Sequence, residues 1–122
     1  MSGILVIDDN AEHIDLVSRV LTARGYTVIA AADAETGLQT AIEHDPDLIL
    51  LDLGLPDLDG QTLIGLLRRV PELAHTRIVA VTAWPQETAR AMVDMYGCDG
   101  YISKPIIRVS AFVDQVAAYL RR

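Results

Sequence analysis

Three apolar runs in this chain stop abruptly at polar residues. Residues 48–51 precede Asp52, residues 4–7 precede Asp8 and Asp9, and residues 78–81 precede Thr82. An uninterrupted apolar run of this length is typical of a strand that is buried on both faces of a parallel sheet. Because the carboxyl ends of parallel strands lie at one edge of a sheet, the pattern predicts that these polar groups meet there.

Between these runs, apolar residues recur every three or four positions, which is typical of amphipathic helices. Asn10 and Asp33 are suited to cap the first two helices, and Gly25 and Gly97 to end the first and fourth. The predicted helices cover about 11–24, 34–44, 61–70 and 85–96, with a last one from about 109. The long apolar runs predict strands at 4–8, 48–52 and 77–82, and short strands at 27–31, expected at the edge, and at 101–103 complete five strand–helix alternations. This order predicts an α/β fold with helices on both faces of a parallel sheet.

The composition narrows the function classes. With 122 residues, 51% of them apolar, the chain suits one packed domain over residues 1–122 and leaves no room for an effector domain. The net charge of −7 argues against direct nucleic-acid binding. No apolar run approaches a membrane span and no secretory signal begins the chain, so we expect a cytoplasmic protein that does not bind membranes. A lone cysteine, Cys98, agrees with that compartment.

Asp8, Asp9 and Asp52 are expected to lie close together. Clustered carboxylates repel, so either some of their pKa values are raised or a cation neutralises them. Oxygen ligands at an exposed rim favour Mg²⁺. A plainer interpretation is also open, in which the paired acids cap a helix and Asp52 accepts hydrogen bonds from loop amides. His13, His44 and His75 lack metal-ligand spacing, so a zinc site is not expected.

Three further residues point to phosphate at the same edge. Lys104 follows the fifth strand, so its ammonium can reach the carboxylates and can serve a phosphoryl group as a point charge. Thr82 offers a hydroxyl and Ala83 a backbone N–H to phosphoryl oxygens. Taken singly, the lysine could form a salt bridge and the threonine could be structural. Together with the three acids, they favour phosphoryl chemistry.

These residues carry a family resemblance over essentially the whole chain. The chain resembles the receiver domain of two-component response regulators, the CheY-like family. The resemblance implies a flavodoxin-like (βα)5 fold with strand order 2-1-3-4-5 and a cis bond between Lys104 and Pro105. The segments that match, in order and spacing, are Asp8-Asp9, Asp52, Asp57-Leu58-Asp59-Gly60, Thr82-Ala83, Gly97-Cys98-Asp99-Gly100 and Tyr101-Ile102-Ser103-Lys104-Pro105.

The resemblance also implies a mechanism. Asp52 would accept a phosphoryl group from a phosphohistidine on a histidine kinase or phosphotransfer protein. Mg²⁺ would be held by Asp9, Asp52 and the Gly54 carbonyl, with Asp8 acting through water. The phosphoryl oxygens would be held by Lys104, Thr82 and Ala83. The protein would be a signalling switch with slow autodephosphorylation, rather than a turnover enzyme.

Switching would involve Thr82, Tyr101 and Pro105. Thr82 would move toward the phosphoryl group and Tyr101 would turn inward. The surface of the fourth helix, fifth strand and fifth helix would then change for a downstream protein. On the fourth helix, Arg90 and Asp94 are expected to be exposed, whereas Met92, Val93 and Tyr96 are expected to pack inward.

Gly54 departs from the family, where a larger residue usually follows the phosphorylated aspartate by two positions. We hypothesise that Trp84 covers the site in its place; the plainer interpretation is that Trp84 only packs on the helix start. An aspartate-nucleophile phosphatase is a less favoured function, because such enzymes usually place a second acid where Gly54 stands. A phosphate-independent interaction module is also less favoured, because none of the acids nor the lysine has been lost.

Overall fold

The protein contains a five-stranded parallel sheet in the order β2-β1-β3-β4-β5. It is described by a computed structural model that covers residues 3–121. The order confirms the predicted α/β fold and places residues 27–31 at the sheet edge, as expected. The strands are β1 (Gly3–Ile7), β2 (Thr27–Ala31), β3 (Leu48–Leu51), β4 (Arg77–Thr82) and β5 (Gly100–Ser103).

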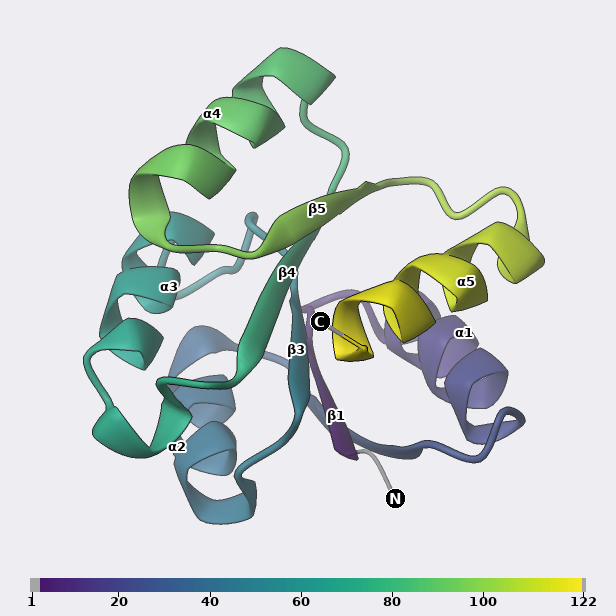
Figure 1. The fold of residues 1–122 in the computed structure, drawn as a ribbon, viewed down its shortest axis with the longest axis horizontal. Coiled ribbons are helices and arrows are strands. Elements are labelled where there is room, and N and C mark those ends of the chain that lie inside the picture. Colours follow the sequence, from purple (N-terminus) through teal and green to yellow (C-terminus); the bar gives the residue numbers. More distant parts are fainter. Residues whose placement is uncertain (1–2, 122) are drawn as a thin grey trace.

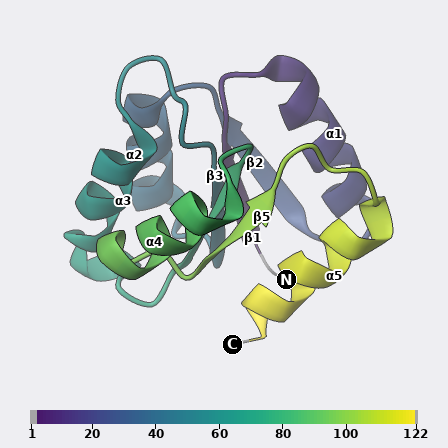
Figure 2. The same cartoon turned by 90° about the horizontal axis from the view of Figure 1, so that it is seen from above.

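Helices cover both faces of the sheet (Figures 1 and 2). One face carries α1 and α5, and the other carries α2, α3 and α4. A short 3₁₀ helix, η1 (Pro71–Leu73), follows α3 and was not predicted. No helix within residues 3–121 is long and apolar enough to cross a membrane. The α-helices are α1 (Ala11–Thr22), α2 (Ala34–His44), α3 (Gly60–Arg68), α4 (Gln86–Tyr96) and α5 (Val109–Leu120).

The sheet separates two hydrophobic clusters, and alternate residues of each central strand enter one or the other. In β1, Leu5 and Ile7 face the cluster beneath α2, α3 and α4, whereas Ile4 and Val6 face the cluster beneath α1 and α5. All four side chains are at most 2% exposed. Burial of such a side chain contributes about 1.5–3 kcal/mol. This two-sided burial explains why the central strands are continuous apolar runs.

Local signals set most helix ends where the sequence predicts them. The Asn10 side chain accepts hydrogen bonds from the backbone N–H groups of Glu12 and His13, which begins α1. Asp33 caps α2 in the same way. Gly97, at a φ of 81°, ends α4 in the left-handed conformation that glycine tolerates. The first helix ends two residues earlier than predicted, at Thr22.

The loop between β3 and α3 lies close against the start of α3. A Cβ atom added at Gly60 would stand 2.6 Å from the Cα of Leu53. Glycine is therefore required at this position by the close approach of two backbone segments. The contact fixes how the loop after β3 returns to the helix, and this loop passes the carboxyl edge of the sheet.

Candidate phosphorylation site

The three predicted acids meet at the carboxyl edge of the sheet. Each offers an oxygen, and these oxygens all lie within 4.8 Å of one another. Asp8 and Asp9 follow β1, and Asp52 follows its neighbour β3. The three differ in burial, since Asp8 is 1% exposed, Asp52 is partly exposed and Asp9 is exposed. The edge therefore combines one buried carboxylate with two that solvent can reach.

Asp8 is held by three donors. The backbone N–H of Asn10 donates to Oδ1 at 2.9 Å. Oδ2 receives the Lys104 ammonium at 3.1 Å and faces Nδ1 of His13 at 2.5 Å. Burial alone would raise the pKa of this carboxyl, but the hydrogen bonds and the Lys104 charge outweigh it and lower the pKa to about 2. The sequence left two ways to relieve the repulsion between the clustered acids, a raised pKa or a neutralising cation. At Asp8 the pKa is lowered, and the neutralising cation is the Lys104 ammonium.

Lys104 lies between two of the acids. Its Nζ atom is 3.1 Å from Asp8 Oδ2 and 3.6 Å from Asp52 Oδ2, and its side chain is 19% exposed. Its backbone N–H donates to the carbonyl of Thr82 at 2.8 Å, which joins the ends of β4 and β5. The bond to Pro105 is cis, as the resemblance implied. The ammonium is thus placed against Asp52 from the β5 side.

Thr82 and the two residues after it line the neighbouring part of the edge. Thr82 is 2% exposed, and its hydroxyl oxygen accepts the backbone N–H of Trp84 at 3.0 Å. Ala83 is exposed. The Trp84 side chain is partly buried and packs against the hydrophobic cluster beneath α2, α3 and α4. That packing agrees with the plainer interpretation of Trp84 and leaves part of the indole at the surface.

Gly54 leaves open space beside Asp52. Its N–H donates to Asp52 Oδ1 at 3.3 Å, and a Cβ atom added at Gly54 would meet no atom within 4 Å. A larger side chain would therefore fit here without displacing a neighbour. Its absence leaves the Asp52 carboxylate open to solvent on this side.

The chemistry of the cluster fits a magnesium ion. Mg²⁺ prefers oxygen ligands and is usually held by one or two carboxylates together with water and phosphate oxygens. Asp9 and Asp52 are accessible carboxylates on adjacent strand ends, and Asp8 lies behind them. The donor set contains no thiolate. The residues present therefore suit a hard, oxygen-seeking cation.

Comparison with known proteins gives one consistent family. The family model of the response regulator receiver domain matches residues 4–116. The polar-differentiation response regulator DivK of Brucella ovis is 34% identical over 118 residues, which covers 97% of this chain and 95% of that protein. The chain belongs to the response regulator receiver family.

Solved structures agree with this family. A two-component response regulator from Clostridium difficile superposes with a TM-score of 0.90 at 27% identity, covering 100% of this chain and 98% of that one. The chemotaxis response regulator CheY4 of Vibrio cholerae gives a TM-score of 0.91 at 24% identity and 98% coverage of both chains, a likeness in fold. The resemblance stated from the sequence is confirmed.

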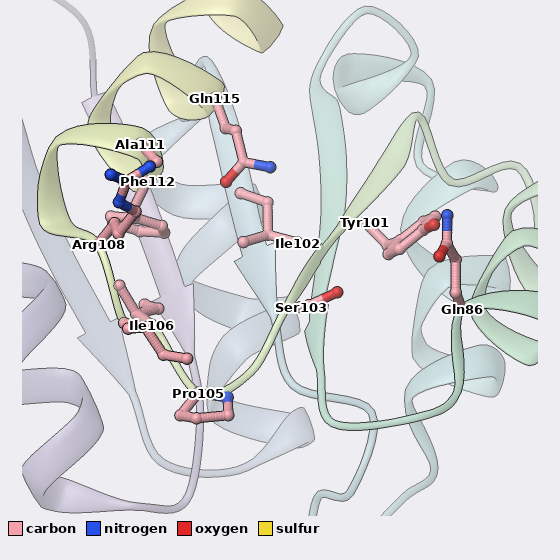
Figure 3. Close-up of a pocket in the computed structure, with 11 residues that line it drawn as sticks. Gln86, Tyr101, Ile102, Ser103, Pro105, Ile106, Arg108, Ala111, Phe112 and Gln115 are labelled. Carbon is pink, nitrogen blue, oxygen red and sulfur yellow. The ribbon is translucent and has the colours of Figure 1, made fainter.

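The receiver has a surface pocket where β5 meets α4 and α5 (Figure 3). Tyr101 is partly buried and points from β5 toward Gln86 at the start of α4. Ile102, the next residue of β5, lies on the α5 side together with Gln115. Neighbouring residues of β5 thus reach both helices of the predicted output surface.

The structure tests the predicted faces of α4. Arg90 and Asp94 are exposed, and Met92 is buried, as expected. The expectation for Tyr96 was wrong, because its side chain is 41% exposed. Tyr96 is the last residue of α4, directly before the left-handed Gly97. An apolar position at a helix end is therefore a weaker guide to burial than one in its middle.

The loop after β3 is tied to α2. The carboxylate of Asp57 accepts the backbone N–H of Ala34 at 2.9 Å and that of Glu35 at 3.1 Å. The next two amides of α2 donate to the side chain and the carbonyl of Asp33. The Ala34 and Glu35 hydrogen bonds lower the pKa of Asp57. The first three N–H groups of α2, which have no partner within the helix, are thus satisfied, two of them from another loop.

His13 is the site contact that sequence reasoning missed. It lies in the first turn of α1, five residues after Asp8, with its side chain 13% exposed. Spacing along the sequence tests His13 only as a metal ligand. It does not test whether His13 contacts Asp8, which ends the strand before its helix. Its position three residues after the capping Asn10, in the first turn of the helix that follows Asp8, was the signal available.

Proposed function

We propose that this receiver is phosphorylated on Asp52 by a phosphohistidine donor in a reaction that depends on Mg²⁺. The observation that carries the proposal is the placement of the Lys104 ammonium 3.1 Å from Asp8 and 3.6 Å from Asp52, beside the accessible Asp9. Catalysis of phosphoryl transfer consists mostly of positioning and charge neutralisation. A carboxylate with a cation at one side and a hard-metal site at the other meets both needs.

Each residue of the site has its own role in phosphoryl transfer. A carboxylate oxygen of Asp52 attacks the phosphorus, and the bond from phosphorus to the donor imidazole breaks with its electron pair left on the imidazole nitrogen. The Lys104 ammonium, the Thr82 hydroxyl and the Ala83 N–H hold the phosphoryl oxygens. Asp9, Asp52 and the Gly54 carbonyl would hold the metal, with Asp8 acting through water. When bound, Mg²⁺ supplies positive charge that offsets the acids and the phosphoryl oxygens.

Phosphorylation acts as a switch through Thr82. Its hydroxyl oxygen accepts the Trp84 N–H in this structure, so movement toward a phosphoryl group would release that hydrogen bond and free the start of α4. Tyr101, which lies beside Gln86, would then turn inward toward the space that Thr82 leaves. The α4-β5-α5 surface would change with them. The switch resets when water attacks the acyl phosphate.

The partners follow from this chemistry. The phosphoryl donor is a histidine kinase or a histidine phosphotransfer protein, and a downstream protein docks on α4-β5-α5. The net charge of −7 supports a protein partner rather than nucleic acid. We place the protein in the cytoplasm, where these donors act.

The test is phosphorylation by a small phosphodonor. Acetyl phosphate with Mg²⁺ should add one phosphoryl group to the wild type, detected by intact mass, and none to Asp52→Asn. Asp94→Asn is the matched control, because it changes an exposed aspartate of α4 outside the site and should leave labelling intact. Chelation of Mg²⁺ should abolish labelling.

Three results would decide against the proposal. Labelling of Asp52→Asn to the wild-type level would move the acceptor elsewhere. Sustained turnover of small phosphoesters by the wild type would indicate an aspartate-nucleophile phosphatase instead of a switch. An interaction module that ignores phosphate would bind its partner equally with and without beryllofluoride.

A further inference from the structure

The contact between His13 and Asp8 joins the first helix to the metal site. Nδ1 of His13 faces Asp8 Oδ2 at 2.5 Å, and Asp8 is 1% exposed. The other ring nitrogen, Nε2, is buried and has no hydrogen-bond partner among the described residues. Since Asp8 can only accept, the ring places a proton on Nδ1 and donates it to the carboxylate.

The contact closes a ring of hydrogen bonds around the end of β1. The backbone N–H of Asn10 donates to Asp8 Oδ1, the Asn10 side chain accepts the backbone N–H of His13, and the His13 imidazole returns to Asp8 Oδ2. Both oxygens of the carboxylate are therefore fixed from α1. The orientation of Asp8 is set by its own helix and by Lys104.

Lys104 cannot donate to Asp8 both before and after phosphorylation of Asp52. Its ammonium is shared between Asp8 and Asp52 here, and the proposed function assigns it to the phosphoryl group on Asp52. When it turns to that group, Oδ2 of Asp8 loses one of its two donors. The Asn10 N–H still serves Oδ1, but a buried carboxylate oxygen without a donor is costly, so Oδ2 needs a donor other than Lys104. His13 is that donor, since it approaches Asp8 from α1 and not from the phosphoryl side.

We infer that His13 is a positioning residue of the phosphorylation site, which holds Asp8 in the orientation needed for Mg²⁺ binding while Lys104 serves the phosphoryl group. This inference rests on the proposed function. His13 touches neither the metal nor the phosphoryl group. It acts through the buried carboxylate, as the hydrogen-bond partners of metal-binding groups commonly do, and loss of such a partner typically weakens metal binding about 10–100-fold.

The experiment measures Mg²⁺ affinity in the unphosphorylated chain. Mg²⁺ alone is titrated into the full chain and the backbone amides of Asp9 and Gly54 are followed by NMR. His13→Ala should bind Mg²⁺ about tenfold more weakly than the wild type. His13→Asn should recover most of the affinity, because its amide nitrogen occupies the place of Nδ1. His13→Gln should not, because its amide reaches the place of Nε2.

Three further measurements separate a positioning role from an effect on folding. His75→Ala removes an exposed histidine at the other end of the molecule and should leave Mg²⁺ affinity unchanged. Long-range nitrogen NMR of the wild-type imidazole should show a proton on Nδ1 of His13. Urea unfolding of each variant reports whether a loss of affinity merely follows a loss of fold.

The outcomes are distinct. Wild-type affinity in a folded His13→Ala, or equal affinities in His13→Asn and His13→Gln, would overturn the inference while leaving the proposed function in place. A wild type that fails to bind Mg²⁺ at these amides would overturn the proposed metal site and this inference with it. Weak binding by the alanine and glutamine variants with recovery by asparagine would establish the role.

Discussion

Asp8 shows how hydrogen bonds can reverse the usual effect of burial on an acid. The folded protein holds the pKa of this carboxyl at about 2, below its ordinary value of 3.8. Folding therefore favours the ionised form. The stability that this contributes is fully present above the unfolded pKa and is lost as the pH falls through the folded one. The gap between the two values corresponds to roughly 2 kcal/mol.

Asp8→Asn tests this effect. In chelator, the free energy of unfolding of the wild type minus that of Asp8→Asn should be constant above about pH 5 and should shrink by roughly 2 kcal/mol toward pH 2. Urea unfolding at a series of pH values measures the difference. A difference that does not change with pH would show that the carboxyl has the same affinity for protons in both states.

Trp84 and Gly54 are the two residues that we hypothesise to set the lifetime of the proposed phosphoryl group. Gly54 leaves Asp52 open on one side, and Trp84 lies two residues after Thr82 with part of its indole at the surface. If the indole shields the acyl phosphate, Trp84→Ala should lose phosphate severalfold faster than the wild type, and Trp84→Phe should be intermediate. Release of phosphate from the labelled protein is the measurement. An unchanged rate in Trp84→Ala would leave the indole a packing role only.

At the scale of elements, Arg68 fastens the end of the sheet opposite the acids. Its guanidinium donates to the carbonyl of Gly97 at 2.8 Å, to that of Thr76 at 2.8 Å and to the carboxylate of Asp99 at 2.7 Å. These partners belong to the end of α4, the loop before β4 and the loop before β5. One side chain of α3 thus joins three other segments.

Arg68→Leu should therefore be costly. Thr76 is 1% exposed, so its carbonyl would lose its donor in a place that water reaches poorly. We expect a loss of about 2–3 kcal/mol in the free energy of unfolding, from the unsatisfied carbonyl and the charge-assisted bond to Asp99. Arg69→Leu is the matched control, because Arg69 is exposed and should cost little. Urea unfolding compares the two, and equal losses would contradict this role.

For the whole molecule, the structure of a segment could be predicted from the sequence where one physical rule governs that segment. Two-sided burial makes apolar runs of the central strands, and the three acids follow those runs, so both the sheet and its polar edge could be predicted. The strand order came from the family resemblance. The strands predicted over 4–8 and 48–52 end one residue earlier, at Ile7 and Leu51.

Contacts set by the path of a loop or the rotation of a helix could not be predicted in this way. Whether His13 faces Asp8 depends on the rotation of α1 about its axis, and apolar spacing fixes that rotation too coarsely to place one ring nitrogen. Asp57 reaches α2 across 23 residues because of the route that the loop takes over the sheet. The sequence places Asp8 at the end of the first strand and Asp57 in the loop after the third strand. It does not show which groups donate hydrogen bonds to them.

Because Asp57 accepts hydrogen bonds from the first amides of α2, those amides should report on movement of the loop after β3. The amides of Ala34 and Glu35 are shielded by a carboxylate that belongs to the segment carrying Gly54. Their own helix offers these amides no acceptor. They can therefore exchange their hydrogens with solvent only when the hydrogen bonds to Asp57 break. Any event that lifts the loop, such as a change at the proposed metal site or the docking of a partner, should therefore be recorded as faster hydrogen exchange at the start of α2.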